Sequence, residues 1–234
     1  MTKSPFRWHT SWSGIVLSED NLILPNTWDL ILDYDIVSDD MLHKDIAMQR
    51  LEFMVREKFE ASIWTNFGNE WADKFYNQLN TFMITLPIDP YDSLIAAATM
   101  LKAQAITKGI FEIHGCSIIS KLGYNVENVV AFEESEELLE LANNLPTASI
   151  LKDPWFARED AGFTDLLVTE DGMTTIIKDT ADWADLDLNW DFYSQHENTH
   201  VDFSEHKSHK EKWIPLIIKG GANNKGKGKG KDED

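Results

Sequence analysis

The chain is poor in cysteine, in long apolar runs and in positive charge, and each shortage excludes a class of protein. Its single cysteine, Cys116, excludes an intramolecular disulfide framework and suits a reducing compartment. No apolar run approaches the ~18 residues that a membrane-spanning helix needs. Residues 1–12 also lack the apolar core of a secretory signal. We therefore expect a soluble, cytoplasmic protein with no membrane partner.

The chain has 21 Lys and Arg residues and 40 Asp and Glu residues, so its net charge at pH 7 is −19. A charge this negative repels phosphate, so we expect no direct binding of nucleic acid. The hydrophobic content of 43% is too high for a disordered acidic chain, and 234 residues can bury a sizeable core. The composition thus predicts an acidic globular protein.

Hydrophobic periodicity predicts an α+β fold, in which an antiparallel sheet accompanies a helical middle section. Residues 28–37 alternate between apolar and mostly acidic positions, as a half-buried strand does, and Pro25 and Asn26 supply a turn before them. The predicted strands are 15–18, 28–37, 111–114, 128–132, 164–168, 173–177 and 213–218. The predicted helices are 39–62, 69–82, 89–109 and 133–144.

Two of these helices carry a stripe of residues that we expect to be buried. In the first, the stripe consists of Ala47, Leu51, Met54, Val55 and Phe59. In the helix over residues 89–109, it consists of Leu94, Ala97, Ala98, Leu101 and Ala105. For that helix, Asp89 is the predicted N-cap, Pro90 takes the first helical position and Gly109 ends the helix.

Changes in composition along the chain predict three sections. Residues 1–145 form an α+β core domain, and residues 146–218 form an acidic section that contains a β-hairpin and packs on it. The hairpin is indicated by Asp171-Gly172 between two β-type runs. Residues 219–234 are rich in Lys and Gly and should be disordered.

One short segment has the pattern of a catalytic zinc site. His196, Glu197 and His200 fit H-E-x-x-H, in which two His bind Zn²⁺ and the Glu polarises the metal-bound water. His206 follows at the spacing of a third ligand, but Phe203 stands where the longer pattern has Gly. A solvated polar loop rich in His is the alternative interpretation of this segment.

A second segment combines tryptophan with an excess of acids. Between residues 170 and 205 there are ten acids and one base, Lys178. Exposed aromatic side chains mark protein interfaces, and opposite charges steer partners together. We therefore predict that this segment binds a protein partner, and competition for a basic surface that binds nucleic acid is one form that such binding can take. Its predicted contact residues are Trp183, Asp185, Asp187 and Trp190.

Two smaller groups of residues allow a chemical role or a structural one. Asp29, Asp33 and Asp35 share one face of a predicted strand, where they can bind Mg²⁺ or simply face solvent. His114 should share a strand face with Cys116 and can activate its thiol, unless the cysteine is a buried structural residue.

Aromatic residues also cluster near the start of the chain and again after the first predicted helix. Such clusters form either an exposed interface or the core beneath a wide sheet, and the sequence does not decide between the two. The residues are Phe6, Trp8, Trp12, Trp64, Phe67 and Trp71.

Residues 24–28 (LPNTW), 86–92 (LPIDPYD) and 102–109 together resemble uncharacterised proteins of large tailed bacteriophages, over about residues 6–130. The resemblance implies a phage product that acts in the host cytoplasm or in a virion, and it implies no activity. The sequence therefore predicts an acidic binding or assembly protein that engages a protein partner and needs no cofactor. The alternative is a zinc-dependent hydrolase that uses residues 196–200.

Overall fold

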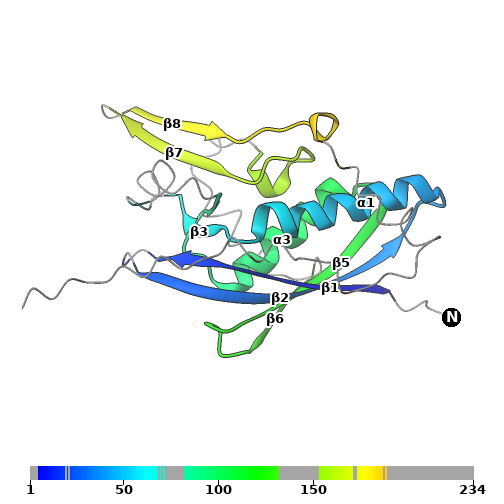
Figure 1. Cartoon of the computed structure of the whole chain (residues 1–234), viewed down its shortest axis with the longest axis horizontal. Helices are drawn as coiled ribbons and strands as arrows, with labels where there is room; N and C mark the ends of the chain where they lie inside the picture. The colour runs from blue at the N-terminus through cyan, green and yellow to red at the C-terminus, as the bar shows by residue number, and fades with distance from the viewer. Residues whose placement is uncertain are drawn as a thin grey trace, which may run out of the picture. The chain divides into compact units, whose positions relative to one another are not determined.

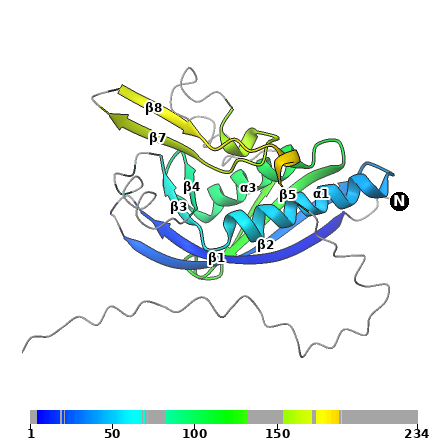
Figure 2. The same cartoon turned by 45° about the horizontal axis from the view of Figure 1, so that its top comes forward.

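A computed structural model of the chain describes residues 5–18, 20, 22–67, 69, 71, 82–131, 153–170, 173–186 and 188. The fold is α+β, as predicted (Figure 1). Helices α1 (Met41–Phe53) and α3 (Asp92–Ile106) lie on one face of a six-stranded sheet that curls around them (Figure 2). All described residues belong to one compact unit, Met1–Trp190.

The sheet is mixed, so the prediction of an antiparallel sheet is only partly correct. Its strand order is β4-β3-β1-β2-β5-β6. Strands β1, β2, β5 and β6 pair antiparallel in turn, whereas β3 pairs parallel with both β1 and β4. The strands are β1 (Phe6–Leu17), β2 (Ile23–Ile36), β3 (Ile63–Asn66), β4 (Met83–Leu86), β5 (Phe111–Ser120) and β6 (Glu127–Ala131).

Strands β1 and β2 form a long hairpin whose inner face supplies much of the core. The predicted alternation in β2 is confirmed, because Trp28, Leu30 and Leu32 are buried while Asp29 is exposed. The predicted turn at Pro25 and Asn26 is wrong, since both residues lie inside β2. Proline is tolerated there for two reasons. The N–H of its partner Ile15 in β1 donates to Ser62, so the pair is a non-hydrogen-bonded one and the nitrogen of Pro25 faces away from β1; on that side β5 pairs with β2 only as far as Trp28.

The first predicted helix is confirmed as α1, which continues as a π-helical segment, η1 (Met54–Phe59). Its predicted stripe is buried in full, from Ala47 to Phe59. The side chain of Asp40 accepts a hydrogen bond from the backbone N–H of Leu42 at 2.9 Å and so caps the helix.

Helix α3 is confirmed as a core element, although it begins later than predicted. Its first residue is Asp92, and Asp89 accepts a hydrogen bond from Asn66 instead of capping the helix. The predicted residues Leu94, Ala97 and Ala98 are buried, but so are residues on the opposite face, because a second layer covers the helix there. Small alanine side chains permit this close packing on two sides.

The second layer consists of residues 153–170, 173–186 and 188, which contain the short 3-10 helices η2 (Trp155–Ala157) and η3 (Trp183–Asp185). The predicted hairpin is confirmed as β7 (Asp165–Glu170) and β8 (Met173–Lys178), paired antiparallel. This layer lies on the side of the helices away from the large sheet (Figure 2). The indole N–H of Trp155 anchors it by donating to the carbonyl oxygen of Thr85 in β4, at 2.7 Å.

The aromatic residues near the start of the chain mostly belong to the core. Trp12 stacks on Trp28 with ring centroids 5.4 Å apart, and Trp64 and Phe59 pack against the same pair. Phe67 is buried as well, whereas Trp71 is 40% exposed and Phe6 52% exposed.

The predicted boundary between residues 145 and 146, the helix over 133–144, the strand over 213–218 and the tail over 219–234 all lie outside the described residues. Most of the helix predicted over 69–82 does so too. Within the described ranges, no helix combines the length and the apolar composition that crossing a bilayer requires.

Candidate functional site

An open cleft of about 640 Å³ lies beside the C-terminal end of the second layer. We call it the acidic cleft, because four carboxylates and one guanidinium line it. Its residues are Arg50 from α1, Glu159 and Asp160 from the segment after η2, and Thr180, Ala181, Asp182, Trp183 and Asp185 around η3. Segments more than a hundred residues apart therefore build one surface.

Trp183, a predicted contact residue, forms a wall of the acidic cleft. Its ring packs edge-on against Phe53 at 5.6 Å, and the guanidinium carbon of Arg50 lies 5.0 Å from its ring centroid. Its indole N–H donates to the carbonyl oxygen of Glu159 at 2.6 Å. The tryptophan is half-buried, so it holds η3 against α1 and also presents part of its ring to the cleft.

The four carboxylates of the acidic cleft differ in their partners. Asp160 lies 3.1 Å from Arg158 and 3.8 Å from Lys102, and Glu159 pairs with the exposed Lys108. Asp182 accepts a hydrogen bond from the backbone N–H of Ala184 at 3.0 Å. In the part of the chain that the structure describes, no ion pair involves Asp182 or Asp185.

Among the described residues that line the cleft, Arg50 is the one with a cationic side chain. Burial lowers the pKa of Arg50, and the nearby carboxylates of Glu159 and Asp182 counteract part of that effect. The guanidinium donates to the carbonyl oxygen of Ile106 at 2.9 Å. Arg50 therefore stacks on Trp183 and bonds to the C-terminal end of α3, although its buried Nε has no hydrogen-bond partner among the described residues.

The other predicted site residues lie outside the described residues. These are Asp187 and Trp190 of the predicted contact segment, and His196, Glu197, His200 and His206 of the predicted zinc site. Among the residues that are described, no three His, Cys, Asp or Glu side chains are grouped closely enough to hold a metal ion.

The acids of β2 do not gather into a cation site. Asp33 accepts from Arg7 of the neighbouring strand at 2.8 Å, and Asp35 lies 3.1 Å from the imidazole of His114. Asp33 and Asp35 therefore each have a neighbour of their own, Arg7 and His114. Asp29 is exposed on the same outer face of the sheet.

The shared strand face predicted for His114 and Cys116 is wrong, and the alternative of a buried structural cysteine is confirmed. A β-bulge shifts the register between β2 and β5, so that Gly115 lies opposite Asp33 and Ile113 opposite Tyr34. His114 then faces solvent, whereas Cys116 faces the core and is 1% exposed. Burial raises the pKa of the Cys116 thiol above its ordinary value, which makes it an inert core residue.

A buried lysine, which the sequence analysis missed, fastens the second layer to α3. The Nζ atom of Lys102 donates to the carbonyl oxygens of Arg158 at 2.9 Å and Asp160 at 2.8 Å, and lies 4.6 Å from the ring centroid of Phe163. Burial lowers the pKa of Lys102 to about 7, although the carboxylate of Asp160 opposes the shift. The sequence did hold one indication of this role, because Lys102 lies within an alanine-rich, apolar helix in which a lysine is unexpected.

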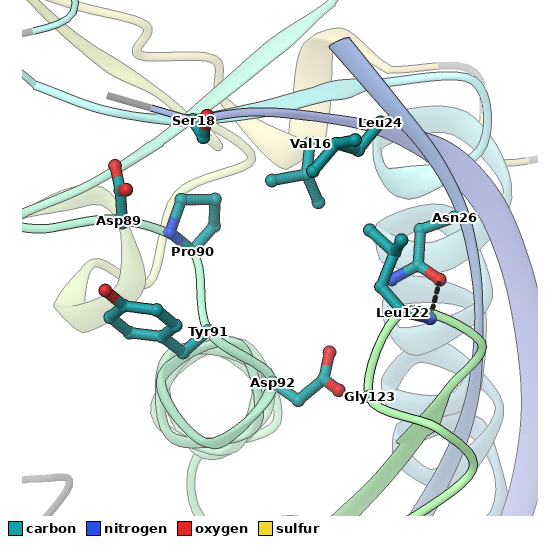
Figure 3. A pocket seen from close by; sticks show the side chains of 10 residues that line it. All are labelled: Val16, Ser18, Leu24, Asn26, Asp89, Pro90, Tyr91, Asp92, Leu122 and Gly123. Atoms are coloured by element: carbon teal, nitrogen blue, oxygen red, sulfur yellow. Dashed lines mark hydrogen bonds between the residues drawn. The ribbon is translucent and has the colours of Figure 1, made fainter. Parts of the chain in front are cut away.

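A second cavity, of about 250 Å³, lies at the N-terminal end of α3 (Figure 3). Its polar side chains include Asp92 and Asn26, a residue for which the sequence predicts a turn. The residues around it are Val16, Ser18, Leu24, Asn26, Asp89, Pro90, Tyr91, Asp92, Leu122 and Gly123.

Comparison with protein-family models finds no match to this chain, and comparison with the curated proteins finds none either. The resemblance to phage proteins therefore stays a prediction. The functional argument depends on the geometry of the two cavities and on the charge around them.

Proposed function

We propose that this protein is a non-enzymatic binding protein whose acidic cleft holds a basic segment of a protein partner. The observation that supports the proposal most is the lining of the cleft, in which carboxylates outnumber cationic side chains four to one. A partner that binds nucleic acid through Lys and Arg offers a segment of this kind.

The arrangement of the carboxylates favours a cationic ligand. Asp182 and Asp185 are exposed and form no ion pair with another described residue, although the charge of Arg50 lies near Asp182, so a cationic ligand can still reach both carboxylates. The net charge of −19 for the whole chain adds a long-range field of the same sign. Opposite potentials accelerate association and make it sensitive to salt.

Trp183 favours a ligand with an aliphatic stem as well as a charge. Its half-buried ring is held by Arg50 and Phe53, so it offers a rigid apolar wall that costs little entropy to use. Lysine and arginine combine a methylene chain with a charged head, and the chain can lie along such a wall while the head reaches a carboxylate.

Binding of a fluorescein-labelled oligolysine peptide, measured by anisotropy, tests the proposal. The cleft variant carries Glu159→Gln, Asp182→Asn and Asp185→Asn together. Each exposed ion pair contributes up to about 1 kcal/mol, so we expect the variant to bind roughly tenfold more weakly at low salt.

A matched control separates the cleft from general acidity. Asp29→Asn, Asp39→Asn and Glu112→Gln remove the same charge from exposed positions outside the cleft, and they should leave the affinity nearly unchanged. Equal weakening in both triple variants would show that the peptide responds to net charge alone, and the proposed role of the cleft would be wrong.

A further inference from the structure

The cavity at the N-terminal end of α3 exists because β5 separates from β2. The two strands pair only up to Trp28 and Ser120, after which the chain turns away toward β6. Val16 of β1 and Leu24 of β2 lie beyond that point. Their side chains are not covered by β5 and border the cavity (Figure 3).

Asn26 directs a hydrogen-bond donor into this cavity. Its side-chain oxygen accepts from the backbone N–H groups of Thr27 at 2.9 Å and Leu122 at 3.0 Å, which fixes the orientation of the carboxamide. The nitrogen, Nδ2, then points to the cavity side (Figure 3) and has no partner among the described residues. Asn26 is only 5% exposed, and a ligand that enters the cavity can take the place of water at this donor.

Asp92 supplies an acceptor at the same end of the cavity. Its carboxylate accepts from the indole N–H of Trp28 at 3.1 Å and from the hydroxyl of Ser120 at 2.6 Å, which leaves lone pairs for a further donor. The neighbouring Gly123 has room for no side chain, because an added Cβ would overlap this carboxylate. Asp92 already places negative charge at the N-terminus of α3, so an anionic ligand is disfavoured.

The cavity is small, and its other walls are partly apolar. Val16, Leu24, Pro90 and Leu122 supply the apolar part, whereas Ser18, Asp89 and Tyr91 add polar groups (Figure 3). A volume of about 250 Å³ is below the ~300 Å³ at which small-molecule pockets begin, so it suits a fragment of the size of one amino-acid residue.

We propose that this cavity binds one aliphatic residue of a peptide together with its uncharged amide. Nδ2 of Asn26 donates to the amide oxygen, the carboxylate of Asp92 accepts from the amide N–H, and the aliphatic side chain contacts Leu24 and Leu122. In an extended peptide the N–H and the C=O of one residue point to the same side, so a single residue offers a donor and an acceptor for the two groups of the cavity. This inference does not depend on the acidic cleft.

Nuclear magnetic resonance of the ¹⁵N-labelled full chain tests the proposal with N-acetyl-leucinamide as the probe. The side-chain NH₂ signals of Asn26 and the indole N–H signal of Trp28 should shift together on titration. A probe of about twelve non-hydrogen atoms should bind with a Kd of about 1 mM. Absence of both shifts at tenfold higher concentration would overturn the proposal.

Two variants and one control locate the site. Asn26→Asp keeps the acceptor for the backbone and removes the donor, and it should weaken binding about tenfold. Leu122→Ala shortens a side chain that lines the cavity but is partly exposed, so the change does not alter the buried core. It should weaken binding about fivefold. Val129→Ala removes an exposed side chain elsewhere and should have no effect.

Three further probes decide the class of ligand. Free leucine and N-acetyl-leucine both carry a carboxylate, which Asp92 should repel, so each should bind more weakly than the amide. Uracil presents a cyclic donor–acceptor edge without an aliphatic chain. Tighter binding of uracil or of either carboxylate than of N-acetyl-leucinamide would contradict the assignment to a peptide residue, and so would unchanged binding in both site variants.

Discussion

Lys102 should make the stability of the fold depend on pH above neutrality. Its Nζ atom donates to two carbonyl oxygens, and an uncharged amine has the two N–H groups that this requires. Burial lowers its pKa from 10.5 in the unfolded chain to about 7 in the fold. Between pH 7 and pH 10.5 the unfolded chain therefore binds a proton at Lys102 that the folded chain does not bind. Raising the pH through this range weakens the preference for the unfolded state, so the free energy of unfolding rises.

The magnitude follows from the shift in pKa. Each pKa unit corresponds to about 1.4 kcal/mol, so the free energy of unfolding should rise by about 2 kcal/mol between about pH 7 and about pH 9 through this group alone. Lys102→Met keeps the aliphatic stem and removes the titrating amine. The variant leaves two carbonyl oxygens without a donor, but it should lose this part of the pH dependence.

Urea unfolding followed by tryptophan fluorescence measures the effect at each pH. The difference in free energy of unfolding between wild type and Lys102→Met should shift by about 2 kcal/mol in favour of the wild type from about pH 7 to about pH 9. Lys108→Met, at an exposed position just beyond the same helix, should show no such shift. Parallel pH profiles for wild type and Lys102→Met would refute the reasoning.

Three other predictions concern separate parts of the molecule. Gly162→Ala should lower the free energy of unfolding by more than about 2 kcal/mol in urea titrations, because the added Cβ would overlap the carbonyl oxygen of Asp179. The thiol of Cys116 should react with Ellman's reagent only after unfolding, and rapid reaction of the folded protein would contradict its buried position. If the segment over 196–200 is a zinc site, the purified full chain should contain about one zinc per molecule. His196→Ala and His200→Ala should each abolish that zinc, and zinc that survives both changes would end the hypothesis.

The fold was predictable where burial leaves a regular pattern along the chain. In β2 one face is buried and the other faces solvent, so the alternation of apolar and polar residues reveals the strand. Strands β3 and β4 escaped prediction because all four residues of each are buried, and a short run that is apolar or small on both faces shows no period. The bulge at His114 was likewise invisible, since an extra residue in a strand leaves no mark in composition.

Of the residues that form the acidic cleft, only those that are close together in the sequence could be predicted. The sequence points to Trp183 and Asp185 because acids and tryptophan lie together along one segment. It does not point to Arg50 or Glu159, which reach the same cleft through packing of α1 and of the segment after η2. Asn26 was missed for a related reason, because its role depends on a backbone N–H that follows β5, nearly a hundred residues later.

The affinity for oligolysine at low and high salt tests the central claim most directly. The wild type should bind at about 0.02 M NaCl and lose most of that affinity at about 0.5 M, where exposed charges are screened. At low salt, the variant with Glu159→Gln, Asp182→Asn and Asp185→Asn should bind roughly tenfold more weakly than the control with three acids neutralised elsewhere. Equal affinities of the two variants would contradict the assignment of binding to the acidic cleft.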